Sequence, residues 1–272
     1  MATPIGNLGD IVPRAVTTLQ QVDIIACEDT RHSKKLLNHL NIQKPLIAYH
    51  DHDEQQRSDE ILALLEAGKD IALISDAGTP LISDPGYRLV QQARQCGFDV
   101  SPLPGPCAAI AALSASGLPS HQFTFIGFPP AKASGRKKWL EGIAQQTATL
   151  ILYEAPHRIV ETLQQAVEIL GGERDAVLGR ELTKTFETFL SGSLKELAEQ
   201  VASDPNQQRG EIVLMIAGAS APQSADDQEQ QRILTLLMEE LPVKKAAALT
   251  AKITGGDRRD LYQLGVSLKS PD

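Results

Sequence analysis

Short apolar runs alternate with helical patterns along the first 117 residues, and this alternation predicts an α/β domain. Strands are predicted at residues 23–27, 46–49, 71–75 and 100–103. Between them, Pro13 begins one helix, apolar positions within 61–65 mark a second helix that ends at Gly68, and the small residues 107–115 predict a third helix closed by Gly117. Strands that alternate with helices in this way indicate a largely parallel sheet.

A second α/β domain is expected over residues 118–218. Strands are predicted at residues 123–128, 149–153, 176–179, 186–190 and 211–217, with some antiparallel pairing. Helices are predicted at residues 159–169 and 194–201.

The last part of the chain has the pattern of a linker followed by helices and shows no strand pattern. Residues 219–227 are rich in Ala, Ser, Pro and Asp and predict a linker. Three short helices follow, at residues 228–241, 243–253 and 258–264, and the turn Thr254-Gly255-Gly256 separates the last two. We therefore expect domains at 1–117 and 118–218, a linker at 219–227, and a small helix-turn-helix-like domain at 228–272.

Composition narrows the class of protein. The chain is 42% hydrophobic and contains three cysteines, none in a close pair, so neither a disulfide framework nor a thiolate metal site is indicated. No apolar run is long enough to cross a bilayer and no signal peptide is evident, so we expect a cytoplasmic protein. The net charge of −8 argues against nonspecific coating of nucleic acid. Residues 244–269, however, hold six basic and two acidic residues, a local patch suited to RNA.

Five loops are dense in turn-forming and charged residues, at positions 3–10, 28–31, 75–86, 104–107 and 153–158. Ligands of α/β sheets bind where loops follow the strands, because free backbone N–H groups meet there. The longest loop combines a Gly78-Thr79-Pro80 turn with aspartates, which suits a zwitterionic nucleoside better than a polyphosphate. The fingerprints GxGxxG and GxxxxGK[ST] are absent, which disfavours dinucleotide oxidoreductases and phosphate-loop NTPases.

The ordered motifs ATPIGNL (2–8), EDTR (28–31), SDAGTP (75–80) with SDPG (83–86), PGP (104–106), YEAPHR (153–158) and RELTK (180–184) resemble the tetrapyrrole-methylase superfamily. Within it they resemble most the 2′-O-ribose cytidine methyltransferases of small-subunit ribosomal RNA. The resemblance implies a two-domain class III methyltransferase fold, a homodimer, and S-adenosylmethionine bound between the domains. It also implies a substrate within the assembled 30S subunit.

The resemblance also implies the cofactor-binding residues. They are Asp76, Ala77, Gly78, Leu81, Cys107, Ala108, Tyr153, Leu182 and Pro4. Two departures stand out: the family usually has Ser at the position of Cys107, and its first strand usually has several more residues before the position of Ala2. We therefore expect the natural start of the chain to lie upstream of Met1.

A ribose hydroxyl is a weak acid, so a proton acceptor or a cation beside it would help the transfer. The candidate proton acceptors, with the first two preferred, are Glu154, Glu181, Asp29 and His157. The candidate RNA-binding residues are Arg31, Arg158, Arg180, Lys184, Lys244, Lys245, Arg258 and Arg259.

Two other functions compete with this interpretation. A methyltransferase of the same fold acting on a porphyrin precursor is one, since a fold does not fix the acceptor. A non-catalytic RNA-binding protein is the other, but it leaves the five loops unexplained. The run from His50 to Glu54 resembles a metal cluster, yet consecutive residues rarely converge on one ion, so we expect no metal and interpret the run as a solvated loop along the RNA groove.

Overall fold

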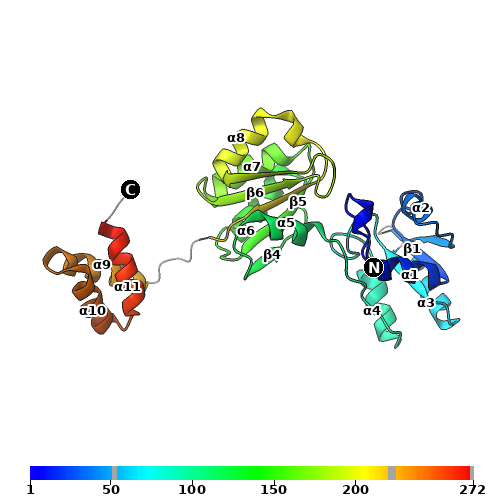
Figure 1. Cartoon of the computed structure of the whole chain (residues 1–272), viewed down its shortest axis with the longest axis horizontal. Helices are drawn as coiled ribbons and strands as arrows, with labels where there is room; N and C mark the ends of the chain where they lie inside the picture. The colour runs from blue at the N-terminus through cyan, green and yellow to red at the C-terminus, as the bar shows by residue number, and fades with distance from the viewer. Residues whose placement is uncertain (51–53, 220–224, 270–272) are drawn as a thin grey trace. The chain divides into compact units, whose positions relative to one another are not determined.

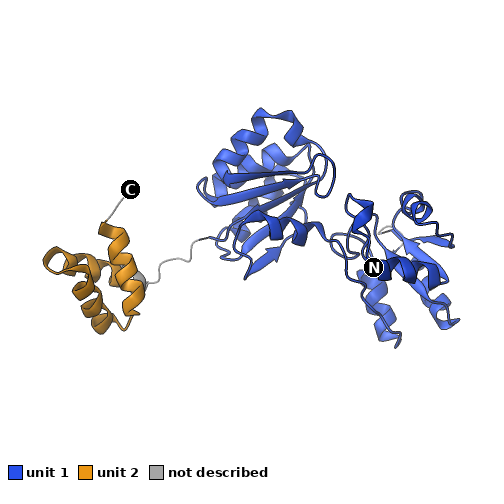
Figure 2. Cartoon of the chain, in the orientation of Figure 1, with its two compact units in different colours: residues 1–219 blue, residues 220–272 orange. Residues whose placement is uncertain are grey.

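The computed structural model describes residues 1–50, 54–219 and 225–269. It consists of two compact units, Met1–Ala219 and Ser220–Asp272 (Figure 2). Each unit has a hydrophobic core of its own. The expected boundary at residues 117 and 118 falls inside the first unit, and it stays a prediction.

The first sheet is parallel and has the strand order β2-β1-β3. Its strands are β1 (Ile24–Cys27), β2 (Leu46–Ala48) and β3 (Ile71–Ile74). The helical segments of this region are η1 (Leu8–Asp10), α1 (Pro13–Gln21), α2 (Thr30–His39), α3 (Glu54–Glu66) and α4 (Tyr87–Gln95). Neighbouring residues of β1 serve opposite faces of the sheet: Ile25 packs with Leu19 of α1, whereas Ala26 packs with Ile61 of α3.

The second sheet is mixed and has the strand order β4-β5-β8-β6-β7. Its strands are β4 (Phe123–Phe125), β5 (Thr149–Glu154), β6 (Asp175–Arg180), β7 (Thr188–Ser193) and β8 (Ile212–Ile216). Only β4 and β5 pair in parallel, and the other neighbours are antiparallel. The helical segments are α5 (Ala108–Ser116), α6 (Ala133–Ile143), α7 (Ile159–Leu170), α8 (Leu194–Ser203) and η3 (Pro205–Gln208).

Helices cover both faces of the second sheet (Figure 1). Leu152 of β5 packs with Leu163 of α7 and Leu197 of α8, in a cluster that also includes residues of α6. The preceding residue of the strand, Ile151, faces the other way and packs with Ala112 of α5. The carboxyl ends of β5 and β6 are thereby fixed between two layers of helices.

The second unit is a three-helix assembly of α9 (Ala225–Glu240), α10 (Val243–Thr254) and α11 (Arg258–Lys269). Its core consists of Leu234, Ala246, Ala247 and Leu261. Gly255 ends α10 in the left-handed conformation, with φ of 75°. The Asp257 carboxylate then caps α11, because its Oδ1 accepts from the backbone N–H of Arg259 at 2.7 Å and of Asp260 at 3.1 Å.

Several predicted elements differ from the structure. The strand expected at 100–103 is absent: the Leu103 carbonyl accepts one long bond, 3.4 Å from the Ala2 nitrogen, and no ladder forms. The strand expected at 186–190 begins instead at Thr188, which pairs with Arg180, because residues between them make the turn. Helix α9 begins at Ala225, inside the segment expected to be a linker.

Three helices were missed, α2, α4 and α6, and each of them buries no more than two apolar side chains. In α2 the buried residues are Ser33, Leu36 and Leu37, and in α4 they are Leu89 and Ala93. Residues 51–53 of the metal-like run lie outside the described residues, and α3 begins at the next residue, Glu54. Among the described residues, no helix combines the length and apolarity that a membrane span requires.

Candidate active site

Hydrogen bonds join three of the expected loops at the edge of the first sheet. Thr3 and Gly78 exchange two backbone bonds, with N···O distances of 2.8 and 3.1 Å. The Thr79 hydroxyl donates to the carbonyl of Pro106 at 2.9 Å. Gly78 has a φ of 86°, a conformation that favours glycine. The N-terminal segment, the loop after β3 and the turn before α5 therefore form one connected wall.

The loop after β3 is strained at two residues that are not glycine. Leu81 has a φ of 72° and Ser83 a φ of 68°. Each such residue costs about 1 kcal/mol or more, and such costs gather at ligand sites, where the surrounding structure holds the backbone in place. The strain therefore marks this loop as a candidate binding segment.

A cavity of about 300 Å³ opens beside this loop. Segments of both sheets contribute to its wall, which is lined by Ile5, residues 77–79, residues 82–84, Cys107, Ala108, Phe128, residues 153–156 and residues 210–213. The volume is at the lower end of the range of small-molecule sites.

The cavity brings together five of the expected cofactor-binding residues: Ala77, Gly78, Cys107, Ala108 and Tyr153. It leaves out the other four: Pro4, Asp76, Leu81 and Leu182. Asp76 turns toward α2, where its Oδ1 accepts from the backbone N–H of Asp29 at 3.1 Å. Leu182 is 7% exposed and packs in the core beside α5. Asp76 and Leu182 therefore stabilise the segments around the cavity and do not line it.

Tyr153 connects the second sheet to the start of α5. Its hydroxyl oxygen accepts from the backbone N–H of Ala109 at 3.1 Å, and its ring lies edge-on to Phe125 and Phe128, with centroids 4.9 and 5.6 Å away. Burial raises the pKa of Tyr153, and the neighbouring Cys107 raises it further. The hydroxyl therefore stays protonated at neutral pH, and the residue offers the cavity a neutral aromatic surface.

Glu154 lies at the end of β5 with no exposed side-chain surface. Its two oxygens accept from the Ala155 backbone N–H at 2.6 Å, the Thr162 hydroxyl at 2.6 Å and the Arg158 guanidinium at 2.5 Å. Three donors occupy most of the acceptor capacity of a carboxylate. Glu154 therefore fastens the loop after β5 to the first turns of α7.

Glu181 forms a cluster with Lys184 and Glu211, and of these three residues Glu211 lines the cavity. The Lys184 ammonium lies 2.9 Å from Glu181 Oε1 and 3.0 Å from Glu211 Oε2, and Glu181 Oε1 also accepts from the Glu211 backbone N–H at 3.0 Å. Burial raises the pKa of Glu181, but these donors, with Arg180, outweigh it and leave the pKa below its usual value. The carboxylate is ionised at neutral pH and tied to its neighbours.

Asp29 and His157 lie outside the cavity wall. The Arg31 side chain, followed by the Arg31 backbone N–H, holds the pKa of Asp29 at about 2. A carboxylate with so low a pKa is a weak proton acceptor at neutral pH. His157 is exposed, and its ring makes no hydrogen bond with the residues that the structure describes.

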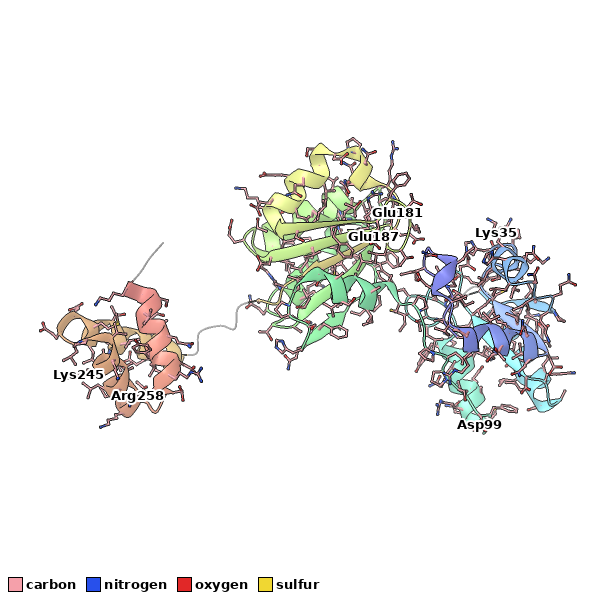
Figure 3. All side chains as sticks on the ribbon, in the orientation of Figure 1. Lys35, Asp99, Glu181, Glu187, Lys245 and Arg258 are labelled. Carbon is pink, nitrogen blue, oxygen red and sulfur yellow. The ribbon has the colours of Figure 1, made fainter. Side chains whose placement is uncertain are left out.

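The basic residues expected to contact RNA fall into three groups. Those near the second sheet are engaged inside the molecule: Arg158 pairs with Glu154, and Arg180 donates to the Phe186 carbonyl and the Thr188 hydroxyl, each at 3.1 Å. Arg31 has 89% of its side chain exposed while paired with Asp29. The tail residues are exposed and form no ion pair within the described ranges: Lys244, Lys245, Arg258 and Arg259. Figure 3 labels Lys245 and Arg258 on the helical unit.

The contribution of β8 to the wall was not predicted from the sequence. Gly210, Glu211, Ile212 and Val213 all line the cavity, although they precede or begin a strand. Because β8 runs antiparallel to β5 and β6, its amino end lies at the edge where their carboxyl ends lie. A search confined to the segments that follow strands overlooks such residues.

Substitution of Gly210 by alanine tests how tightly this corner is packed. Gly210 has a φ of +76°, and a Cβ there would collide with the Glu181 carboxylate. Gly68 has the same φ of +76° with open space around it, so Gly68→Ala is a matched control that isolates the backbone cost, about 1–2 kcal/mol. We expect Gly210→Ala to lower the free energy of unfolding, measured in denaturant, clearly more than Gly68→Ala does. Equal losses would mean that Glu181 moves aside freely.

The first unit contains two helix-covered sheets, with a cavity among the loops at their edges. Known methyltransferases have the same arrangement. The chain superimposes on uroporphyrin-III C-methyltransferase from Thermus thermophilus with a TM-score of 0.57, at 18% identity, over 79% of this chain and 91% of that one. It superimposes on diphthine synthase with a TM-score of 0.60, at 13% identity, over 79% and 88% of the two chains. At such identities the likeness shows the fold alone, and it confirms the predicted class III methyltransferase fold.

The chain belongs to the tetrapyrrole (corrin/porphyrin) methylase family, whose model matches residues 2–198. The model of the RsmI C-terminal HTH domain matches residues 224–269, which confirms the predicted helix-turn-helix. Two relatives are each 55% identical over 265 residues: "Ribosomal RNA small subunit methyltransferase I" of Pseudomonas aeruginosa, with 97% of this chain and 94% of the relative covered, and that of Vibrio cholerae, with 97% and 92% covered. The resemblance seen in the motifs is thus confirmed.

Proposed function

We propose that this chain transfers a methyl group from S-adenosylmethionine to the 2′-hydroxyl of a cytidine ribose in small-subunit ribosomal RNA. The observation that carries the proposal is 55% identity to relatives named for methylation of that RNA, over nearly the full length of both chains. The ribose hydroxyl and the cytidine rest on the family resemblance of the sequence motifs. The family match supports the methyl donor.

The cavity suits a zwitterionic nucleoside in size and in chemistry. Ile5, Phe128 and Val213 offer apolar surface for a base, and the carboxylates of Asp84 and Glu211 can accept from hydroxyl or amino groups. We propose that the five expected residues in the wall hold the cofactor: Ala77, Gly78, Cys107, Ala108 and Tyr153. When bound, S-adenosylmethionine supplies an activated methyl group, so the main task of the protein is alignment.

The proposed roles of the charged side chains follow from their contacts. We assign Glu154 and Glu181 to holding the loops of the site, because each accepts several hydrogen bonds from its neighbours. Arg158, Arg180 and Lys184 serve the same purpose as partners inside the molecule. Asp29 and Arg31 remain candidates for contact with RNA at the surface, and His157 remains a candidate proton acceptor.

We further propose that the second unit binds RNA and that the chain acts as a homodimer on the assembled small subunit in the cytoplasm. The exposure of the four tail cations and the helix-turn-helix match support the first part. Among these solved structures, a porphyrin-type substrate has only fold-level support, from the uroporphyrin-III C-methyltransferase at 18% identity. A non-catalytic RNA-binding role is disfavoured by the methylase match over residues 2–198.

A direct experiment tests the proposal in two stages. S-adenosylhomocysteine at 100 times its dissociation constant is expected to stabilise the purified protein by about 2.7 kcal/mol, seen as a higher melting temperature. Ribose methylation of small-subunit RNA, mapped by mass spectrometry, is expected to lack one modified cytidine in cells without this protein and to regain it on complementation. A complete methylation map in those cells would overturn the choice of acceptor, whatever the melting result.

A further inference from the structure

The wall of the cavity is acidic. Among the described residues that line it are three carboxylates, Asp84, Glu154 and Glu211, and no lysine, arginine or histidine. The Arg158 guanidinium balances Glu154 from outside the wall. The Glu154 side chain has no exposed surface, so the lining carboxylates that a ligand in this cavity can meet are Asp84 and Glu211. Carboxylates in a lining without a basic side chain favour a positively charged ligand over a neutral one.

Glu211 and Glu154 lie at the same edge of the sheet but face opposite sides. Val213 pairs with Tyr153, and both pack on the α5 side, whereas Ile212 pairs with Glu154 on the side of α7. Glu211 continues β8 as extended chain, since its carbonyl accepts from the Glu181 N–H at 2.9 Å. Side chains alternate along a strand, so Glu211 shares the face of Val213 and Tyr153. Of Glu211 and Glu154, Glu211 is thus the carboxylate on the cavity side of the sheet.

The Glu211 side chain is both held and accessible. Lys184 fixes its Oε2 at 3.0 Å, yet 71% of the Glu211 side chain is exposed. Glu154, in contrast, has no exposed side-chain surface and three donors. Of these two carboxylates, Glu211 is therefore the one that a ligand can meet.

Two aromatic rings complete this corner of the wall. Tyr153 and Phe128 both line the cavity, with ring centroids 5.6 Å apart at 64°, and Phe128 is 53% exposed. Faces of aromatic rings attract cations. A carboxylate and two rings within one lining are a combination suited to a cationic centre.

We propose that Glu211, with the rings of Tyr153 and Phe128, makes the cavity selective for the positive charge of the methyl donor over its uncharged thioether product. This inference rests on the proposed function, because it concerns the same cavity and its cofactor. The sulfonium of S-adenosylmethionine carries a charge that S-adenosylhomocysteine lacks, while the rest of the two molecules is the same. Selection for that charge favours exchange of product for fresh donor after each turnover.

The test compares two ligands by isothermal titration calorimetry. Sinefungin carries a protonated amine in place of the methylsulfonium, and S-adenosylhomocysteine carries no charge there. We expect Glu211→Gln to weaken sinefungin binding about three- to tenfold and S-adenosylhomocysteine binding less than twofold. Glu211→Asp should keep most of the preference. Glu173→Gln, which removes an exposed carboxylate outside the wall, is the matched control and should change neither affinity.

The possible outcomes separate this inference from the proposed function. If the wild-type protein binds neither ligand, the proposed function fails. If it binds both, and Glu211→Gln weakens both equally or neither, the charge selection is wrong. Phe128→Leu provides an independent readout should Glu211→Gln fail to fold: it is expected to lower sinefungin affinity about twofold or more, with little effect on the thioether. An unchanged ratio of the two affinities in that variant also overturns the inference.

Discussion

Replacement of Glu154 by alanine is expected to destabilise the protein by about 3–5 kcal/mol and to abolish cofactor binding and methylation together. The carboxylate is fully buried and the paired Arg158 side chain is 16% exposed, so the substitution leaves a largely buried guanidinium without its partner. The Thr162 hydroxyl and the Ala155 N–H lose their acceptor as well. Denaturant unfolding and calorimetric titration with S-adenosylhomocysteine measure the two losses on the same sample.

Glu154→Gln distinguishes a fastening role from a chemical one. The amide keeps the shape but removes the charge and one acceptor oxygen, so we expect an intermediate loss of stability and a matching loss of affinity. If Glu154→Gln instead keeps full stability and full cofactor affinity while methylation falls, Glu154 acts as a proton acceptor. The double variant Glu154→Gln with Arg158→Gln should recover part of the stability lost in the single variant, because no unpaired charge remains.

Deletion of residues 220–272 is expected to leave cofactor affinity within about twofold of wild type and to reduce methylation of small-subunit RNA by about tenfold or more. The deleted unit has its own core of Leu234, Ala246, Ala247 and Leu261, so its loss leaves the cores of the first unit intact. Calorimetry with S-adenosylhomocysteine and transfer of a tritiated methyl group check the two parts. Unchanged methylation would reduce the tail to a structural appendage.

A charge variant of the tail refines that test. Alanine at Lys244, Lys245, Arg258 and Arg259 should weaken RNA binding and flatten its dependence on salt concentration, because fewer phosphate contacts displace fewer counterions. Glutamine at Glu239 and Glu240, two exposed carboxylates at the end of α9, is the matched control. RNA affinity that is equally weak in both variants would point to folding of the unit rather than to phosphate contact.

The sequence predicted the fold well where an element buries an apolar stripe. The pattern around Ile159 to Leu170 predicted α7 almost to the residue, because five of its side chains are buried. It failed for α2, in which the buried face includes Ser33 and the cap is the Asp29 carboxylate. It also failed at residues 100–103, since a strand exists only through its neighbours and none pairs with this one.

The candidate site was predicted in its loops and missed in its details. Motif positions placed Gly78, Cys107 and Tyr153 at the ligand, and all three line the cavity. The contacts of Glu154 and Lys184 could not be predicted from the sequence. Residue type alone does not reveal how many donors surround a carboxylate or which carboxylate pairs with a lysine. Glu211 was missed because the direction of β8 is set by tertiary pairing, not by local pattern.

The antiparallel pairing of β5 with β8 also determines which side chains of the two strands face the cavity. Tyr153 lies opposite Val213, and Glu154 lies opposite Ile212. The first pair faces the side of the sheet that carries α5 and the cavity, and the second pair faces the side covered by α7. A shift of β5 by one residue would turn the Glu154 carboxylate toward the cavity and bury the Tyr153 phenol among the aliphatic side chains under α7. Insertions or deletions within either strand should therefore be far more harmful than equal changes of length in the loops that join them.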